Sequence, residues 1–93
     1  MRTIEWTRQF KRDYRRTKAT PRYKNIDTIL EFVTGLLASD KPLPPNNWDH
    51  ALGGDWVGFR ECHLRPDLLL IYDKPRADVL QMVRLGSHSE LFG

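Results

Sequence analysis

Three histidines and one aspartate in the second half of this sequence are the side chains best suited to acid–base chemistry. His63 and Asp67 flank a three-residue connection, 64–66, between two predicted strands. Residues at the two shoulders of a hairpin face each other with Cβ atoms about 4.5–5.5 Å apart, so we expect the imidazole and the carboxylate to form a coupled pair. Taken alone, such a pair is more typical of an exposed hairpin tip than of a catalytic site.

Further ionisable groups lie next to turns and strands that can converge on this pair. His50 lies on a predicted loop, Arg60 and Arg84 on predicted strands, and His88 near the end of the sequence. Zinc binds sets of three histidines, or two histidines and a carboxylate, so a metal-dependent nuclease is one alternative. It is the less favoured one, because the sequence lacks the close helical spacing of a zinc protease motif.

The favoured alternative is cleavage of RNA without a metal. In that reaction the ribose 2′-OH attacks its own phosphate, one group accepts the 2′ proton, and another protonates the departing 5′ oxygen. Histidine can serve in either role near neutral pH, whereas arginine offers a permanent bidentate cation to the phosphate. An aromatic side chain can stack on an unpaired base, and Phe92 is the candidate for this contact.

Length and composition predict one small domain that spans residues 1–93. Hydrophobic residues make up 40% of the chain and aromatic ones 11%, which is enough for one core and excludes a disordered chain. The sequence has no apolar run of membrane-spanning length and no signal peptide, so we expect a soluble cytoplasmic protein with no membrane partner. Cys62 is the single cysteine, and we expect a small buried residue rather than a nucleophile.

Positive charge is concentrated near the N-terminus. Residues 1–24 contain nine basic and two acidic side chains, whereas residues 25–93 contain six basic and ten acidic ones. The local balances of +7 and −4 add up to the formal net charge of +3. A basic surface on an otherwise mildly acidic protein favours contact with a nucleic-acid backbone over a merely solvated helix face.

The first half of the sequence predicts a short strand followed by two helices. Residues 2–6 alternate polar and apolar side chains, and Thr7 is placed to cap a helix over residues 8–18 with a wide basic face. The Thr20-Pro21 pair interrupts this helix. A second helix is predicted over residues 22–39, where apolar side chains recur every three or four positions.

The second half predicts a proline-rich loop over residues 40–47 and then a β-meander. The first strand of the meander begins at Trp56. The second covers residues 68–72 and is apolar throughout, and the third covers residues 78–85. The fold class is therefore α+β, in the order β-α-α-β-β-β, with both helices on one face of an antiparallel sheet. The other face, which carries Leu69, needs a cover or a ligand.

Three blocks of the second half resemble the YafQ branch of the RelE-like bacterial toxins. The blocks are D-H-x-L-x-G-x-W-x-G-F-R over residues 49–60, H-x-x-P-D over 63–67 leading into L-I-Y, and R-x-G-S-H-x-x-L-F-G over 84–93. Each block alone is a weak signal, but their order and spacing agree across most of residues 49–93. The basic first helix and the amphipathic second helix fit in kind rather than in motif.

The resemblance implies a RelE-like fold and a ribosome-dependent endoribonuclease, or mRNA interferase. Such a toxin enters the A site of the 70S ribosome, cuts mRNA without a metal or other cofactor, and inhibits translation and growth. A cognate antitoxin is implied as well, with a DNA-binding domain such as a ribbon–helix–helix, which neutralises the toxin. The complex of the two is expected to bind operator DNA through the antitoxin and to repress its own operon.

The resemblance also assigns roles by position. The acid–base set is His50, His63, Asp67 and His88, and the RNA-binding set is Arg60, Arg84 and Phe92. We expect Asp67, alone or with His63, to be the base for the 2′-OH and His88 to be the acid for the leaving oxygen, while His50 orients or stabilises. Arg60 is equally compatible with a structural ion pair to Asp49 or Glu61.

One position departs from the family pattern. Leu68 follows the aspartate where the better-known members carry tryptophan, which puts the codon or base preference in doubt rather than the chemistry. The main alternative from another class is a catalytically inactive toxin homologue that only binds its antitoxin and acts as a co-repressor. The intact set of three histidines and an aspartate argues against it.

Overall fold

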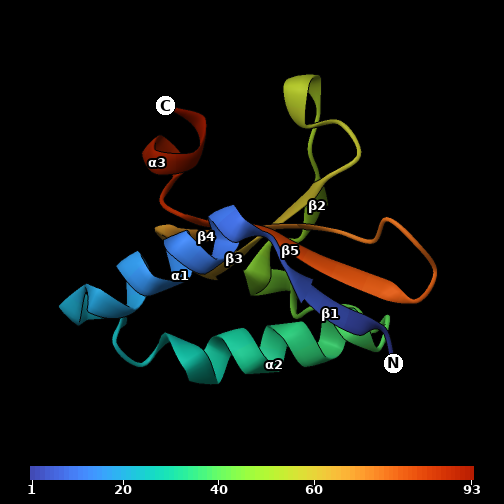
Figure 1. The fold of residues 1–93 in the computed structure, drawn as a ribbon, viewed down its shortest axis with the longest axis horizontal. Coiled ribbons are helices and arrows are strands. Elements are labelled where there is room, and N and C mark those ends of the chain that lie inside the picture. Colours follow the sequence, from blue (N-terminus) through green and yellow to red (C-terminus); the bar gives the residue numbers. More distant parts are fainter.

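A computed structural model describes residues 1–93 and shows an α+β fold built on one five-stranded sheet (Figure 1). The elements are β1 (Thr3–Trp6), α1 (Arg8–Ala19), α2 (Ile26–Ala38), β2 (His50–Ala51), β3 (Arg60–Arg65), β4 (Leu68–Asp73), β5 (Val79–Gly86) and α3 (His88–Phe92). Short 3₁₀ turns lie at Pro21–Tyr23, Pro45–Asn47 and Gly54–Trp56. None of the helices has the length and hydrophobicity that crossing a bilayer requires.

The strand order is β1-β5-β4-β3-β2. It confirms the predicted meander but corrects the prediction for the two edges of the sheet. Strand β4 pairs antiparallel with both β3 and β5, as expected. Strand β1, however, pairs with β5 in parallel, so the sheet is mixed rather than antiparallel. The short strand β2, which carries His50, adds a fifth strand to the opposite edge.

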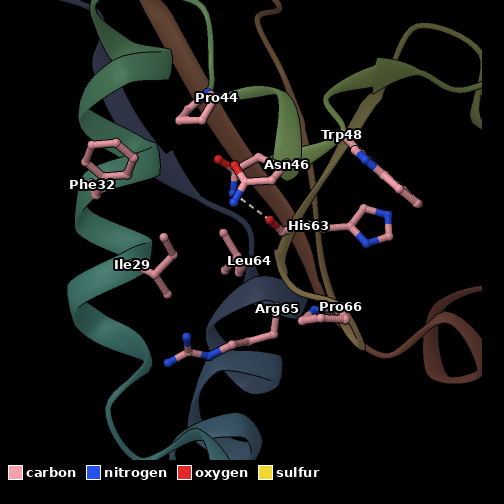
Figure 2. A pocket seen from close by; sticks show the side chains of 10 residues that line it. Ile29, Phe32, Pro44, Asn46, Trp48, His63, Leu64, Arg65 and Pro66 are labelled. Carbon is pink, nitrogen blue, oxygen red and sulfur yellow. Dashed lines mark hydrogen bonds between the residues drawn. The ribbon is translucent and has the colours of Figure 1, made fainter.

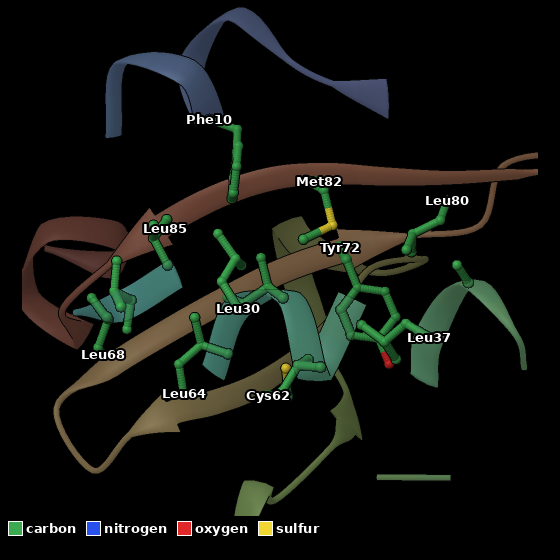
Figure 3. Packing of buried hydrophobic residues seen from close by; sticks show 14 residues of the cluster. Phe10, Leu30, Leu37, Cys62, Leu64, Leu68, Tyr72, Leu80, Met82 and Leu85 are labelled. Carbon is green, nitrogen blue, oxygen red and sulfur yellow. The ribbon is translucent and has the colours of Figure 1, made fainter. Parts of the chain in front are cut away.

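Helices α1 and α2 cover one face of the sheet, which confirms the predicted two-layer arrangement. Phe10 of α1 and Leu30 of α2 are buried against sheet residues such as Leu70 and Met82 (Figure 3). Cys62 is fully buried in the same cluster, as expected, and this burial raises the pKa of its thiol.

The first helix begins at the predicted position, and the second begins later than predicted. The hydroxyl of Thr7 accepts a hydrogen bond from the N–H of Phe10 at 3.0 Å, which caps α1. The second helix starts at Ile26 rather than Arg22, because Pro21 fixes its own φ and residues 21–23 close into a 3₁₀ turn.

The first strand of the central hairpin begins at Arg60, not at Trp56 as predicted. Gly54 and Gly58 have φ values of +59° and +93°, which lie outside the conformations of an extended strand. The segment between β2 and β3 is therefore a folded loop rather than part of a strand (Figure 1).

This loop and helix α3 cover the second face of the sheet, which meets the predicted need for a cover. Leu69 and Ile71 are buried there beneath Leu91 of α3 and Trp56 of the loop. In Figure 1, α2 lies below the sheet, whereas α3 and the loop lie above it. Helix α3 was not predicted, although Ser87 and its partner three residues later form a capping box that marks its start.

Helix α1 also closes the edge of β5 beyond the point where β1 ends. The Thr7 hydroxyl donates to the carbonyl of Val83 at 2.8 Å, and the Arg16 guanidinium donates to the carbonyl of Leu85 at 2.9 Å. The N–H of Leu85 in turn donates to the carboxylate of Asp13 at 3.0 Å. These bonds satisfy backbone groups that would otherwise offer an open strand edge to other chains.

The free energy of unfolding is expected to fall in acid because of Asp13. Burial opposes the charge on Asp13, but hydrogen bonds from Arg84 and Leu85 and the charges of Arg84 and Arg16 outweigh it, so the pKa of Asp13 lies below its ordinary value of 3.8. A group whose pKa is lowered by folding stabilises the folded state at pH values above its unfolded-state pKa. This contribution to the free energy of unfolding is lost as the pH falls through the folded-state pKa.

Urea unfolding followed by tryptophan fluorescence tests this expectation. The free energy of unfolding should be nearly level from about pH 6 to pH 5 and should decline below about pH 4. Asp13→Asn should show a shallower decline than the wild type, since asparagine does not titrate. Equal slopes for the two proteins would contradict the assignment to Asp13.

Candidate active site

The side of the sheet away from α1 and α2 carries all three histidines. Residues that are directly opposed in a sheet point to the same side. The register opposes His50 to Glu61, Glu61 to Ile71, and His63 to Leu69. His88 begins α3, which covers this same side of the sheet.

His50 has an oxygen atom close to each of its ring nitrogens. Its Nδ1 lies 2.7 Å from the carbonyl oxygen of Trp48, and its Nε2 lies 3.0 Å from Oε2 of Glu61. Glu61 is only 6% exposed, and its Oε1 is buried without a hydrogen-bonding partner. The sequence interpretation considered Glu61 only as a partner of Arg60 and therefore missed this contact.

His63 has a free ring and a fixed backbone. The amide of Asn47 donates to the carbonyl of His63 at 2.8 Å, whereas neither ring nitrogen of His63 has a hydrogen-bonding partner within the protein. The ring packs edge-on against the indole of Trp48, with centroids 5.4 Å apart (Figure 2). Trp48 has a φ of +47°, which is rare for a bulky residue and marks a strained segment that supports both histidines.

The predicted pair of His63 and Asp67 does not form. The hairpin has a two-residue turn, because Arg65 pairs with Leu68, and His63 is opposed to Leu69 instead. The carboxylate of Asp67 binds the guanidinium of Arg22, in the segment between α1 and α2. Hydrogen bonding from Tyr23 and the charge of Arg22 hold the pKa of Asp67 below its usual range.

Arg60 has a structural ion pair, which was one of its two predicted roles. Its Nε lies 3.3 Å from the carboxylate of Asp49 and 3.3 Å from the hydroxyl of Tyr72, and that hydroxyl donates to Asp49 at 2.6 Å. Burial and the hydrogen bond to Asp49 raise the pKa of Tyr72. Since Arg60 is opposed to Tyr72 in the sheet, its side chain points to the face that α1 and α2 cover, away from the histidines.

Arg84 is anchored by a two-point contact with Asp13. Its Nε and Nη2 donate to the two carboxylate oxygens of Asp13 at 2.7 and 3.3 Å. The register shifts by one residue at Val83, which breaks the alternation of the strand next to Arg84. The third nitrogen of the guanidinium, Nη1, has no hydrogen-bonding partner within the protein.

His88 belongs to a row of aromatic rings on α3 and the β2–β3 loop. The ring of His88 lies 5.1 Å from that of Phe92, and Phe92 lies 5.9 Å from Trp56. His88 is exposed and its ring makes no hydrogen bond. The structure therefore places the predicted acid and the predicted stacking residue side by side.

A cavity of about 710 Å³ lies between α2 and the β3–β4 hairpin (Figure 2). Ile29 and Phe32 of α2 form one wall, and Leu64 lies at its centre. Of the predicted site residues, only His63 lines it. No group of three or more His, Cys, Asp and Glu side chains is placed to hold a metal ion.

Comparison with known proteins identifies the family. Residues 2–93 match the family model described as bacterial toxin of type II toxin–antitoxin system, YafQ. The mRNA interferase toxin YafQ of Escherichia coli K12 is 37% identical over 92 residues, covering 99% of this chain and 97% of that protein.

Two solved structures show the same fold over the whole chain. The crystal structure of the E. coli DinJ–YafQ complex matches with a TM-score of 0.84 at 35% identity and covers 100% of both chains. The crystal structure of a metal-bound toxin from Helicobacter pylori matches with a TM-score of 0.82 at 46% identity, covering 99% of this chain and 100% of that one. The resemblance noted in the sequence is thus confirmed along with the fold: the chain belongs to the YafQ family of type II toxin–antitoxin toxins, whose curated E. coli member is an mRNA interferase, an endoribonuclease.

Proposed function

We propose that this chain is a ribosome-dependent endoribonuclease toxin that cuts mRNA in the ribosomal A site by metal-independent acid–base catalysis. The observation that carries the proposal is the placement of three histidines and an aromatic side chain on one face of the sheet. Two of these histidines, His63 and His88, have ring nitrogens free of any partner within the protein. Free imidazoles can accept and donate protons near neutral pH, as attack by a 2′-OH requires.

The base for the 2′-OH is His63 in this proposal, rather than Asp67. The sequence interpretation assigned the base to Asp67, alone or with His63. The lowered pKa of Asp67 makes its carboxylate a weak base, and that carboxylate is already paired with the guanidinium of Arg22. His88 protonates the departing 5′ oxygen, and Arg84, which Asp13 holds in place, supplies positive charge to the phosphate.

The basic face of α1 is proposed to bind the phosphate backbone of ribosomal RNA. The exposed basic residues of α1 that make no ion pair within the protein are Arg8, Lys11, Arg12 and Arg15. Positive side chains without internal partners are free to replace the counterions of a phosphate backbone. This contact would hold the toxin on the ribosome before its active site binds mRNA. The toxin and the ribosome would meet in the cytoplasm.

The partner that controls this activity is proposed to be a cognate antitoxin. The E. coli relative is known in a complex with DinJ, and this chain shares its fold over its full length. An antitoxin with its own DNA-binding domain would neutralise the toxin and would bring the complex to operator DNA.

A purified translation system tests the proposal. Wild-type toxin should cut a translated transcript at in-frame positions that primer extension detects as new 5′ ends. A matched transcript without its start codon should stay intact, because the ribosome does not load it. Equal cutting of both transcripts would rule out ribosome dependence, and no cutting of either by folded protein would favour the inactive co-repressor.

Replacing Phe92 with alanine is expected to weaken the binding of mRNA in the site. Stacking of one base on an aromatic side chain contributes about 1–3 kcal/mol, so KM should rise roughly five- to 150-fold. Phe32→Ala is the matched control, since Phe32 is an exposed aromatic residue on α2, on the other side of the sheet from α3, which carries Phe92 (Figure 1). An unchanged KM for Phe92→Ala would assign Phe92 to packing against Trp56 alone.

A further inference from the structure

We infer that Arg16 and Glu90 are positioning residues, and that their ion pair fixes the start of α3, where His88 lies. This inference rests on the proposed function, because it concerns how the acid of that reaction is held in place. The sequence motifs mark neither residue, since Arg16 lies on α1 and Glu90 occupies an unspecified position of the last block.

Helix α3 depends on contacts with the rest of the protein. It has five residues, too few for a helix to be stable by itself. Leu91 is its only buried residue, and Phe92 packs beside it on the same apolar cluster. Both apolar contacts lie at the end of the helix, so its start, at His88, needs a second anchor.

Glu90 joins the start of α3 to α1. Its Oε1 accepts a hydrogen bond from the N–H of Ser87 at 2.7 Å, and its Oε2 lies 3.2 Å from Nε of Arg16 in an ion pair. One carboxylate therefore caps the helix and ties it to a distant element. His88 follows directly after the capped residue, so its backbone is fixed by this contact.

Arg16 connects this anchor with the proposed phosphate contact. Its Nη1 donates to Asp13 at 3.0 Å and its Nη2 donates to the carbonyl of Leu85 at 2.9 Å. Asp13 also binds Arg84, so the four charged side chains form a series of alternating sign. The hydrogen bond to Asp13 and the charges of Asp13 and Glu90 raise the pKa of Arg84 against the opposing effect of burial.

Gly86 allows these side chains to meet over the end of β5. It is opposed to Leu69, so it faces the side of the sheet that α3 covers. A Cβ at this position would lie 3.0 Å from Oε1 of Glu90, 3.1 Å from Nη2 of Arg16 and 3.2 Å from Cδ2 of Leu91. Contacts this short would push the neighbouring side chains apart, so the close approach of α3 and α1 fits glycine.

Glu90→Gln separates the position of α3 from the stability of the fold. Glutamine can still cap through its amide oxygen, but it offers Arg16 no negative charge. The side chains of Arg16 and Glu90 are 42% and 45% exposed, and ion pairs of this exposure add little to stability. The midpoint of urea unfolding should therefore shift by less than about 0.7 M.

Amide hydrogen exchange tests the anchor without any cleavage. The N–H of Leu91 donates to the carbonyl of Ser87 at 3.0 Å and closes the first turn of α3. In Glu90→Gln, the protection factor of this N–H, which corrects for the changed neighbour, should fall roughly two- to fivefold. Glu5→Gln is the matched control, since Glu5 is a half-exposed carboxylate paired with Arg76, and it should leave Leu91 unchanged. Equal protection in Glu90→Gln and the wild type would overturn the inference.

Single-turnover cleavage tests whether the ion pair acts through His88. Glu90→Gln should lower kcat roughly three- to thirtyfold and change KM by less than about twofold, whereas Glu5→Gln should match the wild type. With sulfur in place of the bridging 5′ oxygen, the leaving group needs no acid, so Glu90→Gln should cut at nearly the wild-type rate. A general structural defect would slow both substrates alike, and that result would contradict a role through His88.

A double variant gives the same test without the sulfur substrate. His88→Ala combined with Glu90→Gln should be no slower than His88→Ala alone, whereas effects that multiply would contradict the inference. If the wild type cleaves nothing, the proposed function fails, while the protection factor of Leu91 still decides whether the ion pair holds α3.

Discussion

Replacing His88 with alanine is expected to slow single-turnover cleavage of mRNA by about a hundred- to ten-thousandfold. His88 is exposed and its side chain makes no hydrogen bond or ion pair within the protein, so the free energy of unfolding should hardly change. The rate falls because the departing 5′ oxygen loses its proton donor. Ser89→Ala, the next residue of α3, is the control and should cleave at the wild-type rate.

A substrate with sulfur in place of the bridging 5′ oxygen separates this role from others. A thiolate leaves without protonation, so His88→Ala should cut this substrate at nearly the wild-type rate. The same substrate should not rescue His63→Ala, whose loss concerns the 2′-OH. Rescue of His63→Ala instead would exchange the acid and base assignments.

Replacing Asp13 with asparagine is expected to lower the free energy of unfolding by about 3–5 kcal/mol. Asp13 is 2% exposed and receives hydrogen bonds from Arg84, Arg16 and the N–H of Leu85. Removing its charge leaves Arg84 partly buried without an anion and leaves the edge of β5 weakly closed. A loss of this size is a large share of the 5–15 kcal/mol that stabilises a typical domain.

Asp55→Asn is the matched control, since Asp55 is exposed and makes no ion pair, and its effect should be within about 0.5 kcal/mol. Urea unfolding of Asp13→Asn, Arg84→Met and the double variant measures the coupling. The double variant should be clearly more stable than the sum of the two single losses implies. Additive losses would mean that the two side chains do not act as a pair.

Much of the fold follows from local sequence patterns. Thr7 marks the start of α1 because its hydroxyl can accept from a free N–H, and the apolar run of β4 requires cover on both faces. The parallel pairing of β1 does not follow, since the alternation of a short strand does not specify its neighbour. The start of α3 does have a sequence signal, since serine at 87 and glutamate at 90 have the spacing of a capping box.

The site is less predictable than the fold because it depends on pairing register. A proline followed by an aspartate suits the two central positions of a tight turn, and that turn removes Asp67 from His63. Glu61 looks like an ordinary strand carboxylate in the sequence. It becomes a buried partner of His50 only because β2 pairs with β3 and the β2–β3 loop and α3 cover that face.

The chemistry of the cut ends tests the central claim most directly. Attack by the 2′-OH must leave a 2′,3′-cyclic phosphate on one fragment and a 5′-hydroxyl on the other. A single 2′-deoxy nucleotide at the cleaved position should abolish the cut while leaving ribosome loading intact. We predict those ends and that loss. A 5′-phosphate with a free 3′-hydroxyl, or full cutting of the deoxy substrate, would contradict acid–base cleavage through the 2′-OH and point to hydrolysis by an activated water.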